Sequence, residues 1–343
     1  MSKINQKYTI QPIFSYKNLI TAFFSMKSEK DTNFYQSGSA ALSSGLKSLI
    51  SQKEITNICL PKFICNEVTD VVRSFKLKIN YYDIDSDLNM MITDDFKKRL
   101  SDKSVILVVN YFGFPADWEL VNQLKKNHGC LVIEDNCHAL YSKRNNELLG
   151  NLGDISFNSL RKVLPLLSGS ILKSNNPEID LTTRYKITIP SFSEITYSLR
   201  GLKNKLSLKK IIIKNNSYKE EYPYIDYFSY KIIKNDMFDG KEIRLLRSRN
   251  YQIWYDFLVD SGLTFFPTLD LDKNISPYAF PCKANSSKEV NKWIDWGRKK
   301  NINIIKWPNF PDEVIMKDMP RGLHNVLLFP VTEQYLLKKS HLI

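Results

Sequence analysis

The sequence predicts an α/β protein with a mostly parallel central sheet wrapped by helices and a smaller C-terminal α+β domain. Short apolar runs alternate with single helical segments through the first half of the chain, which is typical of strands joined by right-handed crossovers. The runs at 105–110 and 130–135 are almost continuously apolar, as in strands covered on both faces. The length of 343 residues exceeds that of a usual single domain. We therefore expect a large domain over 1–239, with its core at about 34–175, and a small domain over 240–343.

Residue spacing places the elements of the large domain. A small-residue turn at 37–42 opens a helix that runs to about residue 50, and Thr93 is the expected cap of a later helix. The further helices are expected at 66–75, 93–100 and 118–126. The strands are expected at 57–60, 77–84, 105–110, 130–135, 154–158 and 170–173.

The C-terminal part alternates in the same way. A long helix over 240–259 connects the two domains, and Ser286 or Ser287 caps a helix that ends near residue 299. A last helix is expected from Thr332. The strands are expected at 278–283, 302–307 and 326–330.

Composition limits the class of protein. Apolar residues make up 43% of the chain and charged residues 25%, with 12 Gly and 14 Pro, which excludes a disordered, collagenous or low-complexity chain. No run of 18 apolar residues occurs, and the first ten residues lack the apolar stretch of a signal sequence, so we expect a soluble cytoplasmic protein. An odd number of cysteines without a CxxC pair favours free buried thiols over disulfides or structural zinc. The cysteines are Cys59, Cys65, Cys130, Cys137 and Cys282.

The net charge of +13, from 49 basic and 36 acidic residues, suggests an anionic partner. The segment 195–219 contains seven basic residues and no acidic one, so it supplies about half of the excess. We interpret it as a solvated helix face, as a contact with an anionic substrate or another subunit, or as a weak contact with a membrane surface. No DNA- or RNA-binding motif accompanies it, so no nucleic-acid partner is expected. The basic residues are Arg200, Lys203, Lys205, Lys209, Lys210, Lys214 and Lys219.

Ligands gather at the carboxyl ends of parallel strands, and three segments are expected to meet there. The first is 37–42, Ser-Gly-Ser-Ala-Ala-Leu. The free N–H groups of Gly38 and Ser39 at a helix start, with the helix dipole behind them, suit a phosphate. An ordinary capped helix is the alternative interpretation.

The second segment, 132–139, is a buried strand that delivers Glu134, Asp135 and His138 to its carboxyl end. An acid that ends such a strand can bind a metal, orient a histidine or pair with a protonated ring nitrogen of a cofactor. A hydrogen-bonded, partly buried side chain without a catalytic role is the alternative for His138. No metal site is expected, because the other histidines show no ligand spacing. These are His128, His324 and His341.

The third segment, 159–165, places Lys162 beside Val163 and shortly before Pro165. Apolar neighbours predict partial desolvation of this lysine, which lowers the pKa of an amine and favours its use as a nucleophile. A surface lysine whose stem crosses apolar neighbours is the alternative. The conjunction of a phosphate-binding helix start, an acid at a strand end and this lysine, in that order, favours the functional interpretation.

This order of motifs resembles the fold-type I enzymes of pyridoxal phosphate, in particular the DegT/DnrJ/StrS family of sugar aminotransferases. Residues 37–42 read SGSAAL, similar to the family's SGTAAL, and 132–139 read VIEDNCHA, similar to VIEDxAQA with His138 in the glutamine position. The segments 82–85 and 110–117 resemble VDxD and HLYGxPAD. The lysine segment, SLRKVLP, looks like a shorter variant of SFxxTKN.

The resemblance implies pyridoxal 5′-phosphate as the cofactor. Lys162 would form the internal aldimine and move the proton during amino transfer, and Asp135 would pair with the pyridinium nitrogen. His138 would hydrogen-bond the cofactor near its phenolic oxygen. The phosphate would be held by Gly38, Ser39 and Ser159.

Two motifs of the family are altered in this chain. The aromatic residue that stacks on the cofactor ring falls near Phe63 or Cys65, so both are candidates for a cofactor contact. The GYNxR segment, whose asparagine reaches the phosphate of a neighbouring subunit, is not recognisable. The segment 234–236, Lys-Asn-Asp, is the candidate for it.

The resemblance implies a homodimeric aminotransferase that transfers an amino group from L-glutamate to a nucleotide-linked keto-sugar in polysaccharide or other glycan biosynthesis. The cofactor and this substrate are both anionic, in keeping with the basic chain. A sugar dehydratase of the same fold is one alternative, but those enzymes carry histidine where Lys162 stands. A non-catalytic protein of the same fold that binds an anionic partner through 200–219 is another.

Overall fold

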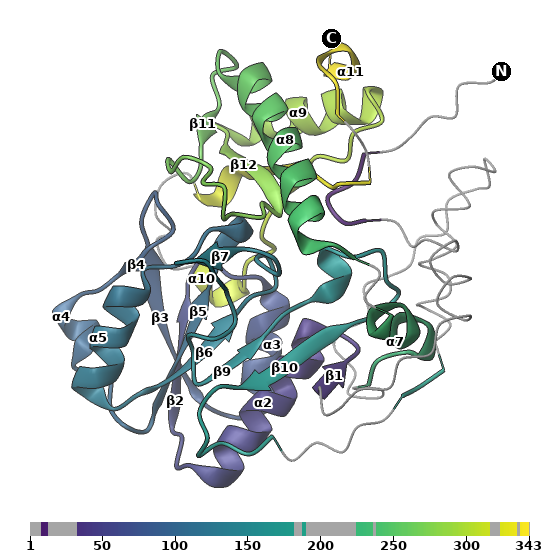
Figure 1. Ribbon diagram of the computed structural model, residues 1–343. Helices are drawn as coiled ribbons and strands as arrows, with labels where there is room; N and C mark the ends of the chain where they lie inside the picture. Colours follow the sequence, from purple (N-terminus) through teal and green to yellow (C-terminus); the bar gives the residue numbers. More distant parts are fainter. Residues whose placement is uncertain are drawn as a thin grey trace.

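A computed structural model gives the architecture of the chain (Figure 1). Its larger sheet has the strand order β1-β10-β9-β6-β5-β2-β3-β4. The four neighbouring pairs from β9 to β3 are parallel, whereas β1, β10 and β4 join the sheet in antiparallel fashion. The predicted class, a mostly parallel sheet with helices around it, is therefore confirmed. The structure describes residues 8–12, 33–181, 187–189, 224–235, 238–315, 323–334 and 337–342.

Most strands and helices of this part lie close to their predicted positions, whereas the strands at 33–35 and 90–91 and the helix at 227–234 were not predicted. Val109, Asp135 and Phe157 are in register across β5, β6 and β9, so three strand ends meet at one edge. The strands are β1 (Asn33–Tyr35), β2 (Asn57–Pro61), β3 (Lys78–Ile84), β4 (Met90–Met91), β5 (Ser104–Val109), β6 (Leu131–Asp135), β9 (Ile155–Phe157) and β10 (Ser170–Ser174). The helices are α2 (Gly38–Gln52), α3 (Asn66–Ser74), α4 (Asp94–Lys97), α5 (Trp118–His128) and α7 (Tyr227–Lys234). A small hairpin, β7 (Lys143–Arg144) and β8 (Glu147–Leu148), follows β6.

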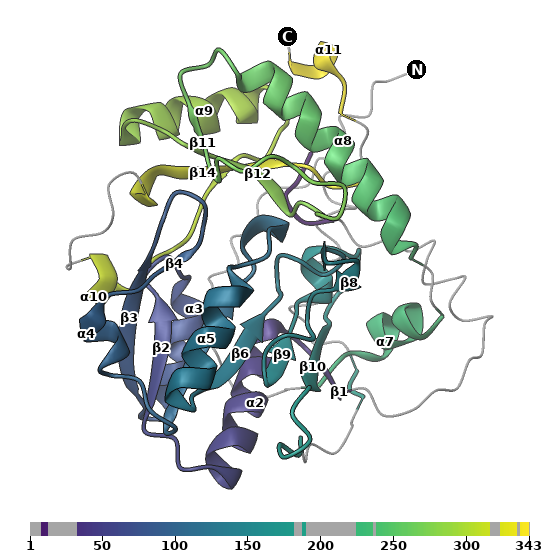
Figure 2. The same cartoon turned by 60° about the vertical axis from the view of Figure 1, so that its left-hand side comes forward.

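A second, antiparallel sheet forms from the C-terminal third, in the order β11-β12-β14-β13. Both views place it, with α8 and α9, above the larger sheet (Figures 1 and 2). The predicted boundary at 239/240 falls at the start of α8, and the division into two domains stays a prediction. The strands are β11 (Thr264–Phe265), β12 (Ala279–Lys283), β13 (Ile305–Lys306) and β14 (Val326–Pro330). The helices are α8 (Gly240–Leu258), α9 (Ser287–Lys299), α10 (Asp312–Ile315) and α11 (Lys339–Leu342).

Two C-terminal predictions are wrong. No helix begins at Thr332: the amide of Asn250 donates hydrogen bonds to the carbonyls of Val331 and Thr332, at 3.3 and 3.0 Å, and a turn follows. The last helix begins at Lys339 instead. The strand expected over 302–307 is reduced to β13, because Ile302 pairs with Tyr8 from the N-terminal part of the chain.

The capping and cysteine predictions agree with the structure. Thr93 accepts a hydrogen bond from the backbone N–H of Phe96 at 3.1 Å, and Ser286 rather than Ser287 caps α9. All five cysteines are free, and Cys65 alone among them is not buried. In the described ranges, no helix is both long and apolar enough to cross a membrane.

Two apolar clusters make up the core. The larger runs through both sheets. The smaller lies under the loop that carries Lys162 and contains residues of that loop, of α7 and of the start of α8. Its fully buried members include Leu160, Val163, Ile232 and Ile243. The lysine loop therefore rests on packing contacts with the helix that leads into the second sheet.

Candidate active site

The N-terminus of α2 opens onto a cavity at the carboxyl edge of the parallel strands. The side chain of Ser37 caps this helix by accepting a hydrogen bond from the backbone N–H of Ala40 at 3.2 Å. Gly38 and Ser39 line the cavity, where N–H groups of a first helical turn and the helix dipole favour an anion. A Cβ atom on Gly38 would lie 2.8 Å from Sγ of Cys137. Glycine therefore permits this close approach of the helix to the end of β6.

The two carboxylates at the end of β6 lie in different surroundings. Asp135 lines the cavity, whereas Glu134 is fully buried away from it. Burial raises the pKa of Glu134, although its hydrogen bonds oppose the shift. Asn110 Nδ2 donates to Glu134 at 2.9 Å. Backbone N–H groups also donate to Glu134, from Gly150, Leu152 and Gly153, at 2.7, 2.9 and 3.2 Å. Glu134 thus ties the loop after β8 to the strand end that presents Asp135.

The Asp135 carboxylate is buried at the edge of the cavity. One of its oxygens accepts a hydrogen bond from the backbone N–H of Cys137 at 2.9 Å. Burial raises the pKa of Asp135, while the positive charge of Lys162 and the hydrogen bonds from Cys137 lower it, and the net direction is upward. A second cationic group in the cavity would therefore stabilise the ionised form of Asp135.

Lys162 ends the 3-10 turn η2 (Leu160–Lys162) that follows β9, and its Nζ lies 3.2 Å from Nε2 of His138. Burial lowers the pKa of the Lys162 ammonium, but acidic side chains around it, first among them Cys137 and Tyr278, raise it more. The predicted lowering of this pKa is therefore wrong. The sequence shows the apolar neighbours of Lys162 along the chain, but not the acidic groups that β6 and the second sheet bring to it.

The imidazole of His138 is held between aromatic rings. Its centroid lies 4.3 Å from that of Tyr278, with the planes 5° apart, and 5.7 Å from that of Phe112 on a nearly parallel plane. Burial lowers the pKa of His138 well below its usual range, and the charge of Lys162 lowers it further. Nε2 of the neutral ring accepts a hydrogen bond from the Lys162 ammonium. The proton of the ring is then on Nδ1. Nδ1 is buried, and no hydrogen-bond partner for it occurs among the described residues.

The cavity has a volume of about 290 Å³. Of the eight residues predicted to contact a cofactor or take part in catalysis, the seven other than Phe63 line it. They are Gly38, Ser39, Cys65, Asp135, His138, Ser159 and Lys162. The structure thus brings together segments that lie far apart in the sequence, although their roles stay predictions. Within the described ranges, no group of His, Cys, Asp and Glu side chains could hold a metal ion.

Phe63 does not line the cavity, which corrects the prediction of a ring contact at this position. Its side chain is fully buried in an aromatic cluster, with ring centroids of Tyr111, Phe266 and Trp307 between 5.0 and 5.6 Å away. Cys65, the residue before α3, faces the cavity instead. Phe63 packs away from the cavity because aromatic residues from the second sheet's connections surround it.

Several cavity residues that were not predicted come from the N-terminal segment and from the connections of the second sheet. Tyr278 precedes β12, and its hydroxyl lies 3.4 Å from Nε2 of Gln11. Arg161 and Trp307 also line the cavity, and Arg161 is 3.5 Å from the side-chain oxygen of Gln11. The tyrosine and tryptophan each lie beside a proline in the sequence, which gives no signal of a site.

Two further predictions concern the segments around α7. Lys234 and Asn235, candidates for the altered GYNxR segment, lie at the end of α7 and do not line the cavity of their own chain. Asp236 and the basic segment 200–219 lie outside the described residues. The role proposed for each in contacts with another subunit or an anionic partner stays a prediction.

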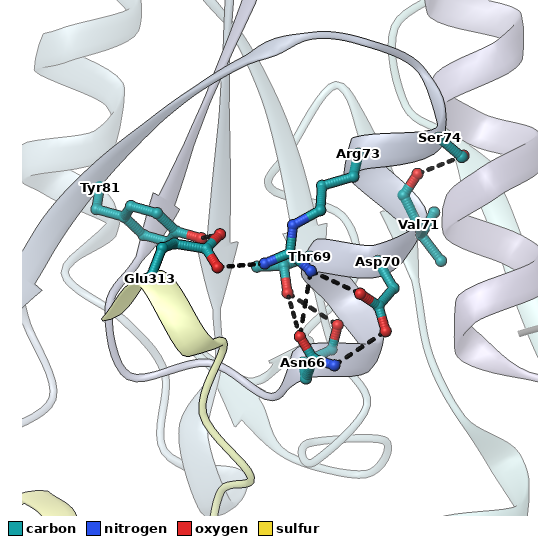
Figure 3. Close-up of polar contacts among 8 residues, drawn as sticks. All are labelled: Asn66, Thr69, Asp70, Val71, Arg73, Ser74, Tyr81 and Glu313. Carbon is teal, nitrogen blue, oxygen red and sulfur yellow. Dashed lines mark hydrogen bonds and ion pairs between the residues drawn. The ribbon is translucent and has the colours of Figure 1, made fainter. Parts of the chain in front are cut away.

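A polar network beside the cavity joins α3 and β3 to α10 (Figure 3). Arg73 forms ion pairs with Asp70, at 2.6 Å, and with Glu313, to which the Tyr81 hydroxyl also donates at 2.8 Å. The hydrogen bond from Arg73 lowers the pKa of Glu313 to about 2. The backbone N–H of Asn66 donates to the carbonyl of Asn309, which lines the cavity, at 2.8 Å. The network therefore fixes the wall that α3 and the C-terminal part share.

The site geometry and the order of motifs agree with a comparison to known families. Residues 25–203, about half of the chain, match the DegT/DnrJ/EryC1/StrS aminotransferase family. The chain belongs to this family. The motifs found in the sequence therefore occur in a member of the family. Gly38, Asp135 and Lys162, which belong to three of these motifs, line the same cavity.

Curated relatives match this family member over short segments only. GDP-perosamine synthase of Escherichia coli O157:H7 is 32% identical over 77 residues, which are 22% of this chain and 21% of that protein. A UDP-4-amino-4,6-dideoxy-N-acetyl-beta-L-altrosamine transaminase of Campylobacter jejuni is 28% identical over 107 residues, 30% of this chain and 28% of that protein. A GDP-4-keto-6-deoxy-D-mannose 3-dehydratase of Yersinia pseudotuberculosis is 25% identical over 83 residues, 24% and 21% of the two chains. The matched segments thus span less than a third of these relatives.

Solved structures match the fold over nearly the whole chain. The PLP form of Spr1654 from Streptococcus pneumoniae, described as a sugar aminotransferase, has a TM-score of 0.70 at 15% identity and covers 98% of this chain and 96% of its own. The sugar aminotransferase CalS13 from Micromonospora echinospora has a TM-score of 0.67 at 17% identity and covers 97% of each chain. The predicted fold-type I architecture is confirmed.

Proposed function

We propose that this protein is a pyridoxal-phosphate-dependent aminotransferase that transfers an amino group from L-glutamate to a nucleotide-linked keto-sugar in glycan biosynthesis. The observation that carries the proposal is the meeting of Lys162 with Asp135 and His138 in one cavity, at the edge where the strand ends and the start of α2 converge. Membership of the aminotransferase family supports the reaction class. Relatives named as a perosamine synthase and an altrosamine transaminase support the sugar substrate.

The residues of the cavity fit this cofactor. Nδ1 of His138 is a buried donor that needs an acceptor, such as a phenolic oxygen. The start of α2 suits an anionic phosphate, because Gly38 and Ser39 of its first turn line the cavity. The buried Asp135 carboxylate suits a protonated ring nitrogen. When bound, pyridoxal phosphate supplies an aldehyde and an electron-accepting ring.

The roles of this chain's own residues follow from those contacts. Lys162 would hold the cofactor through its primary amine. His138 accepts from Lys162 at Nε2 and so orients its Nζ. Asp135 would hold a protonated ring nitrogen of the cofactor, whose positive charge its carboxylate stabilises. Trp307 and Tyr278 line the same cavity and would help to exclude water from the Lys162 amine.

An absorbance spectrum tests the proposal. We expect purified protein with added pyridoxal phosphate to show a visible band that shifts on addition of L-glutamate, and Lys162→Ala to lack it. Lys47→Ala, at an exposed position of α2, is the matched control and should retain the band. A colourless protein that cannot be reconstituted with the cofactor would contradict the proposal. A panel of nucleotide keto-sugars, assayed with L-glutamate, then identifies the acceptor.

A dehydratase reaction is the competing outcome, because relatives named as 3-dehydratases are also found. Lys162 favours amino transfer, since a primary amine can hold the cofactor where a histidine cannot. Conversion of a keto-sugar with loss of water, in place of stoichiometric formation of 2-oxoglutarate, would decide for the dehydratase. We also propose that the protein is a cytoplasmic homodimer. Light scattering of the purified protein measures the number of subunits.

A further inference from the structure

Arg247 is a buried arginine that the predicted chemistry does not use. It lies in the middle of α8, and its side chain is 1% exposed. Its guanidinium donates in three directions, each to a different segment of the chain. The acceptors are Glu333 Oε2 at 2.7 Å, the carbonyl of Pro277 at 3.3 Å and the carbonyl of Val163 at 3.3 Å.

Two of these acceptors lie next to residues of the active site. Val163 follows Lys162 directly, and Pro277 directly precedes Tyr278. The side chains of Lys162 and Tyr278 both contact His138: Nζ lies 3.2 Å from Nε2, and the tyrosine ring stacks 4.3 Å away. One guanidinium therefore holds the backbone beneath both groups that fix the imidazole.

The chemistry of this contact requires an arginine. Packing alone would favour an apolar side chain, because desolvation of a buried ion pair can cost as much as its attraction returns. The planar guanidinium presents several donors at fixed angles, so it can reach three acceptors at once, whereas the ammonium of a lysine is a compact charge on a flexible stem. Glu333, 11% exposed, balances the charge.

We propose that Arg247 is a positioning residue for the aminotransferase reaction, which sets the placement of Lys162 against His138 and Tyr278 by joining the lysine loop to the second sheet. This inference rests on the proposed function for the reaction that it serves.

Arg247→Lys tests the proposal with the charge kept. In the full-length protein with pyridoxal phosphate bound, we expect the half-reaction with L-glutamate to slow about 100-fold with little change in the glutamate KM, because a displacement of about 1 Å has effects of that size. Arg249→Lys, at an exposed position of the same helix, is the matched control and should keep the wild-type rate. Equal rates in the two variants would overturn the proposal.

Two further measurements separate positioning from stability and from the proposed function. Glu333→Gln weakens the ion pair but leaves the bonds to Val163 and Pro277, so we expect a lower Tm with a half-reaction within about threefold of wild type; a 100-fold loss there would overturn the proposal. Competitive acetylation of Lys162 before cofactor addition, followed on its tryptic peptide, should show a shifted pH midpoint in Arg247→Lys, because the amine changes its surroundings when its loop moves. An unchanged midpoint contradicts the positioning role even if the wild type never binds the cofactor, and the absorbance test alone judges the proposed function.

Discussion

Arg247 and Arg73 both join the larger sheet to the C-terminal part of the chain, but their surroundings differ. Arg247 is enclosed under the lysine loop and bonds to two backbone carbonyls and a carboxylate. Arg73, 39% exposed on α3, pairs with Asp70 and Glu313 at the surface (Figure 3). Water can replace the partners of Arg73, whereas it has little access to those of Arg247, of which Glu333 is 11% exposed. Similar contacts therefore stabilise the two junctions by different amounts.

The largest effect is expected when the buried arginine is removed. Arg247→Met leaves the carboxylate of Glu333 without its cation and two buried carbonyls without donors, so we expect unfolding to become easier by about 3 to 5 kcal/mol. Urea unfolding followed by circular dichroism measures this change. The double variant Arg247→Met with Glu333→Leu should recover much of the loss, because no unpaired charge then remains. Failure of the double variant to recover any stability would show that the ion pair is not the cause.

Glu134 is a second buried charged residue, and it also depends on hydrogen bonds that water does not replace. Glu134→Gln keeps the shape of the side chain but turns an amide NH2 toward backbone N–H donors, so one or two of them lose their acceptor. We expect a loss of about 1 to 3 kcal/mol in the free energy of unfolding. Glu147→Gln, at an exposed position of β8, serves as the control and should be neutral. Equal stabilities in the two variants would contradict a structural role for the Glu134 contacts.

The stability that the exposed Arg73–Glu313 ion pair contributes should depend on pH. The pKa of Glu313 is lowered from 4.5 to about 2 by Arg73, so its contribution is fully present above pH 4.5 and is lost as the pH falls toward 2. Because both side chains are partly exposed, Glu313→Gln should cost less than about 1 kcal/mol at pH 7. Thermal melts of both proteins at pH 7 and pH 3 measure the difference, which should shrink at the lower pH. A difference that grows on acidification would refute this assignment.

The smallest effect is expected for the ion pair between Lys53 and Glu178, which is the most exposed of these contacts. Lys53 pairs with Glu178 at 2.9 Å, and the glutamate side chain is 71% exposed. Glu178→Gln should change Tm within experimental error, since surface ion pairs of this kind contribute little. A destabilisation as large as that of Glu313→Gln would mean that exposure does not separate the two classes of contact.

Local sequence patterns predicted most elements of the larger sheet. Apolar runs such as 105–110 and 130–135 became β5 and β6, and the small-residue turn at 37–42 became the start of α2. These predictions succeed because burial on both faces of a strand and capping of a helix leave their mark within a few residues. The short strands and the last helix were predicted less well, since a distant residue, Asn250, takes the carbonyls near Thr332.

The residues of the candidate site were likewise predicted only in part. Motif order predicted that Asp135, His138 and Lys162 share one site, because each lies at or shortly after the end of a strand that the crossover pattern sends to one edge. It did not show that Phe63 turns into an aromatic cluster while Cys65 faces the cavity. Those positions are set by rings from the second sheet's connections, which no spacing near residue 63 reveals.

The sequence by itself therefore predicted the fold class, the family and the place of the lysine in the cavity, because each depends on residue types at short, ordered spacings. Only the tertiary structure decided the state and the support of that lysine. Its pKa is raised rather than lowered, since acidic groups from distant segments surround it. Its loop is held by Arg247, whose three bonds exist only after α8 has packed against both parts of the chain.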